Sequence, residues 1–194
     1  MKIRLASPVL MPDSIVDGEG IRAVLWTQGC RHKCPGCQNP QTHSFKDGFI
    51  IDIEEIKQQI DELEGQDGIT FSGGDPFYQV DECIEIAKYI KKKNMNIWCY
   101  TGFTYEVLLN LAKENPKIIE FLKLIDVLVD GPFILEKKSL DSIFRGSTNQ
   151  RIIDTKESLK SKKVTLVDKY YIEKKTKNGF GNLLLLVMQL EILM

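Results

Sequence analysis

The stretch that decides the fold reads IRAVLWTQGCRHKCPGC over residues 21–37. Its first part, residues 21–27, is largely apolar and rich in branched or aromatic side chains, which predicts a strand. The strand leads into a glycine and then into three cysteines in one short loop, Cys30, Cys34 and Cys37. Thiols that gather in this way can hold an inorganic centre, so the sequence predicts a metal or iron–sulfur site at a strand end.

Beyond this loop, predicted helices and strands alternate. Apolar residues at helical spacing predict helices over 52–64, 80–92, 104–113 and 117–123, and short apolar runs predict strands over 68–71, 95–100 and 125–129, with weaker signals at 152–153 and 164–166. Such alternation implies parallel strands joined by right-handed crossovers. The chain has 194 residues, which is too short for a complete eight-stranded barrel of about 250 residues. We therefore expect an α/β fold, a partial (open) parallel β/α barrel of about four to six strands.

The unusual motifs of the chain stand at predicted strand ends. They are Gly29-Cys30, Ser72-Gly73-Gly74-Asp75, Tyr100-Thr101-Gly102 and Asp130-Gly131-Pro132. In parallel α/β folds, ligands bind at the carboxyl ends of the strands. The sequence therefore predicts a single active site to which all of these motifs contribute.

The cysteine loop has two interpretations. A structural zinc ion needs four ligands, and His32 or His43 could complete the set. An iron–sulfur cubane is usually held by four cysteines, so three would leave one iron open, as in reactive metal sites. The spacing favours the cluster without excluding zinc. The other two cysteines, Cys83 and Cys99, lie in apolar patterns and are expected to pack in the core.

The composition is that of an ordinary globular protein, with 43% hydrophobic and 27% charged residues. The formal net charge of −1 provides no overall field for nucleic acid or membrane, so neither is expected as a partner. An odd number of cysteines, five, argues against a disulfide framework and for metal or redox chemistry in a reducing compartment. No apolar signal segment follows Met1, and we expect a cytoplasmic protein.

Residues 1–166 are expected to form one core domain, and residues 167–194 a basic and then apolar tail with no assigned role. In the last part of this tail, residues 183–194, only Gln189 and Glu191 are polar. This part is too short to span a bilayer, which takes about 20 residues. A buried closing element or a subunit contact is the expected role.

The Cys-x3-Cys-x2-Cys loop resembles the signature of the radical S-adenosylmethionine enzymes. Its surroundings resemble the glycyl-radical-enzyme activases within that family, and especially those that act on anaerobic ribonucleoside-triphosphate reductase. The matching stretches are DGEGIR (17–22), QGC (28–30), CQNPQT (37–42), TFSGGDP (70–76), WCYTG (98–102), VDGPF (129–133) and FRGSTNQR (144–151). The resemblance covers most of the chain, residues 3–166.

The resemblance implies an oxidoreductase with a [4Fe-4S] cluster on Cys30, Cys34 and Cys37, whose open iron chelates S-adenosylmethionine. Reductive cleavage of this cofactor yields a radical that removes a hydrogen atom from a glycine of anaerobic ribonucleoside-triphosphate reductase. A flavodoxin- or ferredoxin-type protein is expected as the electron donor. The alternatives are an activase of another glycyl radical enzyme such as pyruvate formate-lyase, a small radical enzyme of deazaguanine synthesis, or a metal module without catalysis.

The resemblance also implies cofactor-binding residues. The segment Ser72, Gly73, Gly74 and Asp75 is expected to face the ammonium group of S-adenosylmethionine. The two glycines would let the backbone approach the ligand, and the Asp75 carboxylate would accept charge-assisted hydrogen bonds. A plain turn is the alternative for this segment.

Three further positions complete the expected cofactor site. Thr101 and Asp130 are expected to help place the methionyl carboxylate, directly or through a cation, with capping of the following helices as the alternative. Gly36 stands where many radical enzymes carry an aromatic residue that covers the adenine. The adenine must then be held by some other part of this chain.

Overall fold

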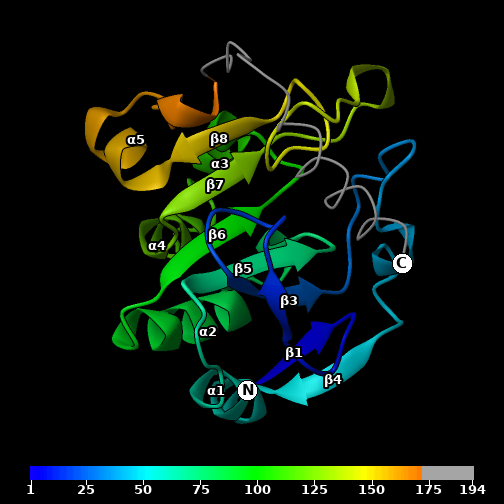
Figure 1. Ribbon diagram of the computed structural model, residues 1–194, viewed down its shortest axis with the longest axis vertical. Coiled ribbons are helices and arrows are strands. Elements are labelled where there is room, and N and C mark those ends of the chain that lie inside the picture. Colours follow the sequence, from blue (N-terminus) through cyan, green and yellow to red (C-terminus); the bar gives the residue numbers. More distant parts are fainter. Residues whose placement is uncertain (172–194) are drawn as a thin grey trace, which may run out of the picture.

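The structure is a computed structural model that describes residues 1–171. Within these residues, eight strands form one mixed sheet in the order β4-β1-β3-β5-β6-β7-β8, with β2 paired to β3 as well (Figure 1). The strands are β1 (Lys2–Leu5), β2 (Met11–Ser14), β3 (Arg22–Thr27), β4 (Phe49–Asp52), β5 (Gly68–Gly73), β6 (Asn96–Tyr100), β7 (Val127–Asp130) and β8 (Arg151–Asp154).

The first four α-helices of the described part begin within one residue of where the sequence predicts them, and the fifth was not predicted. The helices are α1 (Ile53–Asp61), α2 (Val80–Lys92), α3 (Tyr105–Leu111), α4 (Lys117–Leu124) and α5 (Thr155–Ser161), and short 3-10 turns lie at 40–42, 76–78, 135–137 and 168–170. Side chains cap the first turns: Asp52 accepts a hydrogen bond from the backbone N–H of Glu54, and Thr104 accepts one from that of Val107. Each cap satisfies an N–H that has no partner inside its helix.

The α/β class is confirmed, but the expected number of strands was wrong. Strands β3, β5, β6 and β7 are parallel, as the alternation predicts. Antiparallel strands extend this group: β1 and β2 pair with β3, β4 pairs with β1, and β8 pairs with β7. Each of these four strands has only four residues. Only β8 falls on a predicted signal, the weak one at 152–153, because such short runs carry little pattern of their own.

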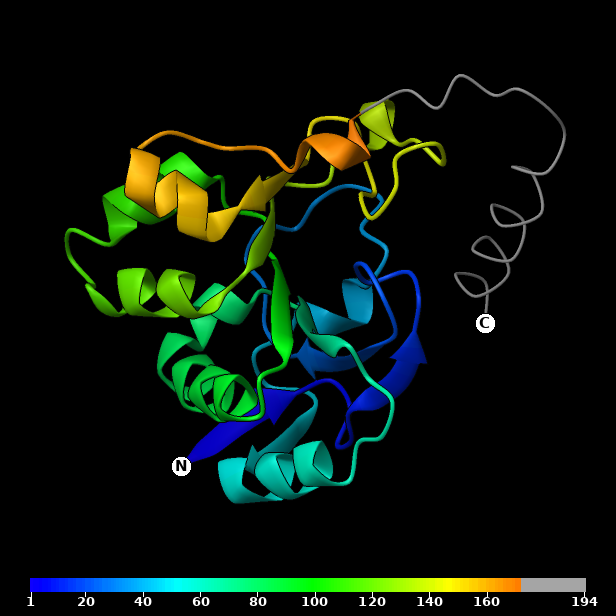
Figure 2. The same ribbon diagram turned by 60° about the vertical axis from the view of Figure 1, so that its left-hand side comes forward.

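The two faces of the sheet are covered differently. Helices α1, α2 and α4 lie along one face, as Figure 1 and Figure 2 show, and the larger core fills the space between them and the sheet. Cys83 and Cys99 are fully buried in this core, which confirms their predicted packing role. Because side chains alternate along a strand, Trp98 points to the other face, where it packs edge-on against Phe144 and Tyr170.

The end of the described chain crosses the second face. The expected strand at 164–166 is reduced to one bridge between Leu166 and Ile153. Lys169 and Tyr170 then hold the Glu19 carboxylate, with the Tyr170 hydroxyl 2.9 Å from Glu19 Oε2. The role expected for residues 183–194 lies outside the described residues. No helix within residues 1–171 has the length and apolar character needed to cross a membrane.

Candidate functional site

The predicted motifs meet at one edge of the parallel strands. Thr27 at the end of β3 lies opposite Gly73 at the end of β5. Just beyond these strand ends, the Asp75 N–H donates to the Gly29 carbonyl at 3.0 Å. At the end of β6, the Thr101 N–H donates to the Val129 carbonyl of β7 at 3.0 Å. Backbone hydrogen bonds therefore join the loop after β3 to the loop after β5, and the loop after β6 to β7.

The cysteine loop leaves β3 at this edge. Its first part is anchored by the backbone, because the Cys30 N–H donates to the His43 carbonyl at 3.1 Å. Its last part is a tight turn in which the Cys37 N–H donates to the Cys34 carbonyl at 3.1 Å. All three thiols are free; Cys30 is buried, and Cys34 and Cys37 are half-buried. The loop thus presents three unpaired thiols from a fixed base.

Burial raises the pKa of two of these thiols, Cys30 and Cys34. It raises the pKa of Cys30 to about 11, against the effect of the His32 backbone N–H, and the charges of Asp75, Cys34 and Cys37 raise it further. Burial also raises the pKa of Cys34, opposed by a backbone hydrogen bond with Phe133. Thiolates are the form that binds metal, so a metal centre must displace these protons when it takes the cysteines as ligands.

The arrangement of the donors suits a cluster better than a single ion. Within residues 1–171, no three His, Cys, Asp or Glu side chains converge closely enough to hold one metal ion. A zinc ion needs four ligands on one centre, whereas a cubane takes each cysteine on a different iron. All five cysteines of the chain lie in the described part, and Cys83 and Cys99 are buried in the helix-side core. The loop therefore offers three thiolates without a fourth cysteine.

The Asp75 side chain contacts several of the segments that meet at the strand ends. Its residue is only 1% exposed, and both oxygens accept hydrogen bonds from the protein. The donors are the Phe77 N–H at 3.0 Å, the Thr101 hydroxyl at 2.9 Å and the Gly102 N–H at 3.0 Å. The Nε2 atom of His32 lies 2.7 Å from its Oδ2. Asp75 thus joins the ends of β5 and β6 to the cysteine loop, and the chain itself already meets much of its capacity to accept hydrogen bonds.

Packing within the protein itself requires glycine at the two positions before Asp75. A Cβ added at Gly73 would lie 2.6 Å from the Thr27 carbonyl oxygen, and one at Gly74 would lie 2.5 Å from that of Gly29. Gly73 also has a φ of +97°, a conformation that side chains disfavour. Gly73 is therefore required for the close approach of the end of β5 to β3, and Gly74 for its approach to the start of the cysteine loop. Ser72 is buried, and its carbonyl accepts a hydrogen bond from the Thr27 hydroxyl at 3.0 Å.

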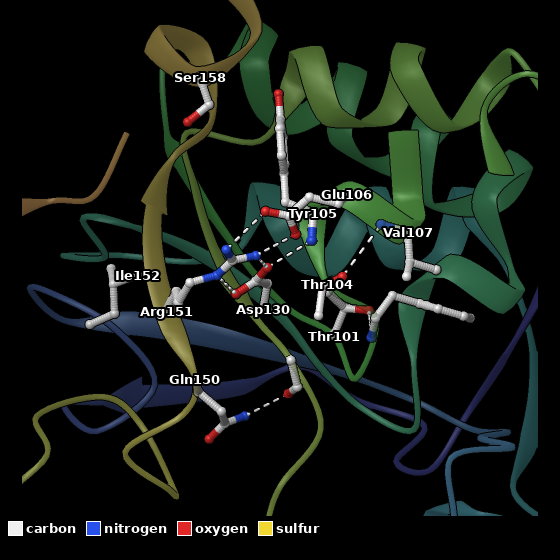
Figure 3. Close-up of polar contacts among 12 residues, drawn as sticks. Thr101, Thr104, Tyr105, Glu106, Val107, Asp130, Gln150, Arg151, Ile152 and Ser158 are labelled. Carbon is white, nitrogen blue, oxygen red and sulfur yellow. Dashed lines mark hydrogen bonds and ion pairs between the residues drawn. The ribbon is translucent and has the colours of Figure 1, made fainter. Parts of the chain in front are cut away.

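Asp130 lies at the same edge but in a network of its own. It is fully buried, and Arg151 donates to it from Nε at 3.0 Å and from Nη2 at 2.5 Å. The Tyr105 N–H, in the first turn of α3, donates to its Oδ2 at 2.7 Å. Figure 3 shows the Arg151 guanidinium between the carboxylates of Asp130 and Glu106. Asp130 thus binds the start of α3, which precedes β7 in the chain, whereas the capping alternative placed it at a helix that follows. Its neighbouring cation is an arginine.

Sequence reasoning did not predict the contacts that His32 and Arg151 make. Arg151 ends the stretch FRGSTNQR, which was matched only as a whole. His32 was weighed as a zinc ligand, but its ring faces Asp75. At Gly36, φ is +70°, and an added Cβ would lie 2.9 Å from the Leu135 side chain. A role of Gly36 in the cofactor site remains a prediction.

Comparisons with known proteins support an iron–sulfur cluster in this chain. A family model described as a 4Fe-4S single cluster domain matches residues 16–153. The chain is 34% identical to the anaerobic ribonucleoside-triphosphate reductase-activating protein of Haemophilus influenzae over 149 residues, which is 73% of this chain and 92% of that protein. Proteins of the same name from Enterobacteria phage T4 and Escherichia coli K12 are 32% and 34% identical, over 74% and 72% of this chain and 90% and 92% of their own lengths.

Proposed function

The chain belongs to the family of the anaerobic ribonucleoside-triphosphate reductase-activating proteins, and we infer that it activates such a reductase by generating a glycyl radical on it. It is an iron–sulfur oxidoreductase that acts on S-adenosylmethionine. The relatives favour this function over an activase of another glycyl radical enzyme and over an enzyme of deazaguanine synthesis. The observation that carries the proposal is the loop of three free thiols at the carboxyl edge of parallel strands.

In this proposal, Cys30, Cys34 and Cys37 hold the [4Fe-4S] cluster. When bound, the cluster supplies the electron that cleaves S-adenosylmethionine, and this cleavage provides the oxidant for the glycine of the reductase. The chain holds the thiols in place from a base fixed by backbone hydrogen bonds at Gly29 and Cys30. No fourth cysteine competes for the remaining iron, because Cys83 and Cys99 are buried in the helix-side core. That iron is then open to a ligand.

We propose that S-adenosylmethionine lies along the strand ends beside the loop, near Ser72, Gly73, Gly74 and Asp75. Asp75 already receives protein hydrogen bonds, so its main contribution is a negative charge close to the ligand's ammonium group. Thr101 contributes by donating its hydroxyl hydrogen to Asp75. Asp130, together with Gly36, bounds the same region from the β7 side. The cation that was expected with Asp130 is replaced by Arg151 in this proposal.

The proposal also covers the barrel type of the fold, the electron donor and the cellular compartment. Four parallel strands with helices along one face support a partial β/α barrel of the radical S-adenosylmethionine type for residues 1–166. The remaining residues, 167–194, are proposed as a tail that follows this domain, and its first residues, Lys169 and Tyr170, contact Glu19 of the domain. A flavodoxin- or ferredoxin-type protein is the proposed electron donor. Free thiols beside a reducible cluster suit the reducing cytoplasm.

The test is an anaerobic reconstitution with iron and sulfide, followed by electron paramagnetic resonance of the reduced protein with and without S-adenosylmethionine. A cubane signal that changes on addition of the cofactor is expected. Mixing with an anaerobic ribonucleoside-triphosphate reductase should then give a glycyl radical signal, which must be absent when the cofactor is omitted. A protein that retains zinc, or a cluster that does not respond to the cofactor, would contradict the proposal.

A further inference from the structure

His32 stands in the middle of the cysteine loop, two residues from Cys30 and two from Cys34. Its Nε2 atom lies 2.7 Å from Oδ2 of Asp75, whose side chain is fully buried, while the His32 side chain is 17% exposed. A buried carboxylate needs hydrogen-bond donors, because its charge has lost contact with water. The imidazole therefore donates from Nε2 to Asp75, and this bond connects the loop to the strand ends.

Asp75 is a fixed point that does not depend on His32. The Phe77 N–H binds its Oδ1, and the Thr101 hydroxyl and the Gly102 N–H bind its Oδ2. These donors belong to the segments that follow β5 and β6. A loop residue that binds Asp75 is therefore placed relative to both strands at once.

The ring of His32 is also held from its sides. It meets Phe103 edge-on, with ring centroids 4.5 Å apart and an interplanar angle of 76°. A Cβ added at Gly102 would lie 2.4 Å from Cδ2 of His32, so the ring rests directly on the Gly102 backbone. A ring that is confined in this way has little freedom to rotate away from Asp75.

The loop needs such external support. Lys33, the next residue, has a φ of +50°, which is uncommon for a residue with a side chain. Backbone in such a conformation persists only where the surrounding contacts impose it. The contacts of His32 with Asp75, Phe103 and Gly102 supply that constraint next to Lys33.

We propose that His32 is a positioning residue. Through its bond to Asp75, it sets the position of Cys30 and Cys34, and of the cluster they hold, relative to the ends of β5 and β6. The distance between the cluster and S-adenosylmethionine bound at those ends then depends on His32, although His32 binds neither. The inference rests on the proposed function, since it concerns how the two cofactors are brought together.

Two substitutions test whether the side chain at position 32 must be long enough to donate a hydrogen bond to Asp75. The amide nitrogen of His32→Gln occupies about the position of the imidazole Nε2, whereas that of His32→Asn has the same chemistry but stops short of Asp75. Lys33→Asn is the matched control, because it introduces the same residue into the same loop, at an exposed position where asparagine tolerates a positive φ. All three variants keep the three cysteine thiols.

The measurement is the electron paramagnetic resonance spectrum of the reconstituted, reduced protein, titrated with S-adenosylmethionine, together with iron and sulfide content and circular dichroism. The cluster content should match the wild type in every variant. The Gln and control variants should respond at wild-type cofactor concentrations, and the Asn variant should need at least about tenfold more.

A wild-type titration curve for a folded His32→Asn variant would overturn the inference. If that variant does not fold, His32→Gln decides: a retained response supports the inference, and a lost response in a folded protein overturns it. These outcomes differ from failure of the proposed function, in which the wild-type cluster itself ignores the cofactor.

Discussion

Arg151 holds the buried Asp130 with two nitrogens, Nε at 3.0 Å from Oδ1 and Nη2 at 2.5 Å from Oδ2. The two residues face each other across the antiparallel pair β7–β8. Asp130 lies at the carboxyl end of a parallel strand, where a ligand is expected. The antiparallel strand β8 places the Arg151 guanidinium against it. Glu106 binds the other side of the guanidinium, at 3.0 Å from Nη1.

Replacing Arg151 by methionine should destabilise the fold strongly. The change keeps much of the side-chain volume but leaves the fully buried Asp130 carboxylate without its counter-charge. Breaking a buried ion pair from one side costs about 3–5 kcal/mol. Urea unfolding of the two proteins measures this loss in the free energy of unfolding.

Lys156→Met is the control for that experiment. Lys156 also pairs with an aspartate, Asp126, but its side chain is 63% exposed, so the change should cost less than about 1 kcal/mol. The double variant Arg151→Met/Asp130→Leu should recover part of the loss, because no buried charge is left. Equal costs for the Arg151 and Lys156 variants would contradict the structural account.

Glu106 should make the stability depend on pH in the acidic range. The hydrogen bonds from Arg151 lower the pKa of Glu106 from 4.5 to about 2. The unfolded chain therefore takes up this proton first as the pH falls. The contribution of Glu106 is complete above its unfolded pKa and is lost as the pH falls to about 2.

The free energy of unfolding of the wild type should therefore exceed that of Glu106→Gln above about pH 5, and the two should converge toward pH 2. The difference should stay below about 1 kcal/mol, because the Glu106 side chain is 58% exposed and screened by water. In an Arg151→Lys background, which loses the bidentate geometry, the difference should shrink. A gap that widens toward low pH would refute the assignment.

Replacing Asp75 by alanine should cost about 3 kcal/mol or more in the free energy of unfolding, since it strips buried donors of their acceptor. Those donors are the Phe77 N–H, the Thr101 hydroxyl and the Gly102 N–H. Asp81→Ala is the control, because Asp81 is exposed and pairs with Lys117 on the surface; it should cost below about 1 kcal/mol. Similar losses in both variants would mean that the hydrogen bonds accepted by Asp75 do not stabilise the fold.

The cysteines should divide into two groups by iron content after reconstitution. Cys34→Ala removes a half-buried loop thiol and should abolish or strongly reduce iron and sulfide binding at a small cost in stability. Cys83→Ala leaves the loop intact and should keep full iron content, while a small cavity in the core costs about 1 kcal/mol. Iron bound equally by the two variants would exclude the loop as the cluster site.

Much of the fold follows from local patterns. The strand 22–27, the helix 80–92 and the N-cap at Asp52 appear where periodicity and capping rules predict them, because each depends on residues close in the chain. Of the four-residue antiparallel strands, β8 had only the weak signal at 152–153, and β1, β2 and β4 were not predicted. These strands are stabilised by partners elsewhere in the sheet, and such short runs carry little pattern of their own.

By itself, the sequence determined the cysteine loop and the meeting of the strand-end motifs, since spacing and strand–helix alternation are properties of neighbouring residues. Only the tertiary structure decided what the polar side chains there contact. His32 and Asp75 are 43 positions apart, and Asp130 and Arg151 are 21 apart. A buried carboxylate must find donors, but which donors reach it depends on how the strands are ordered and paired, and that ordering is set by packing of the whole chain.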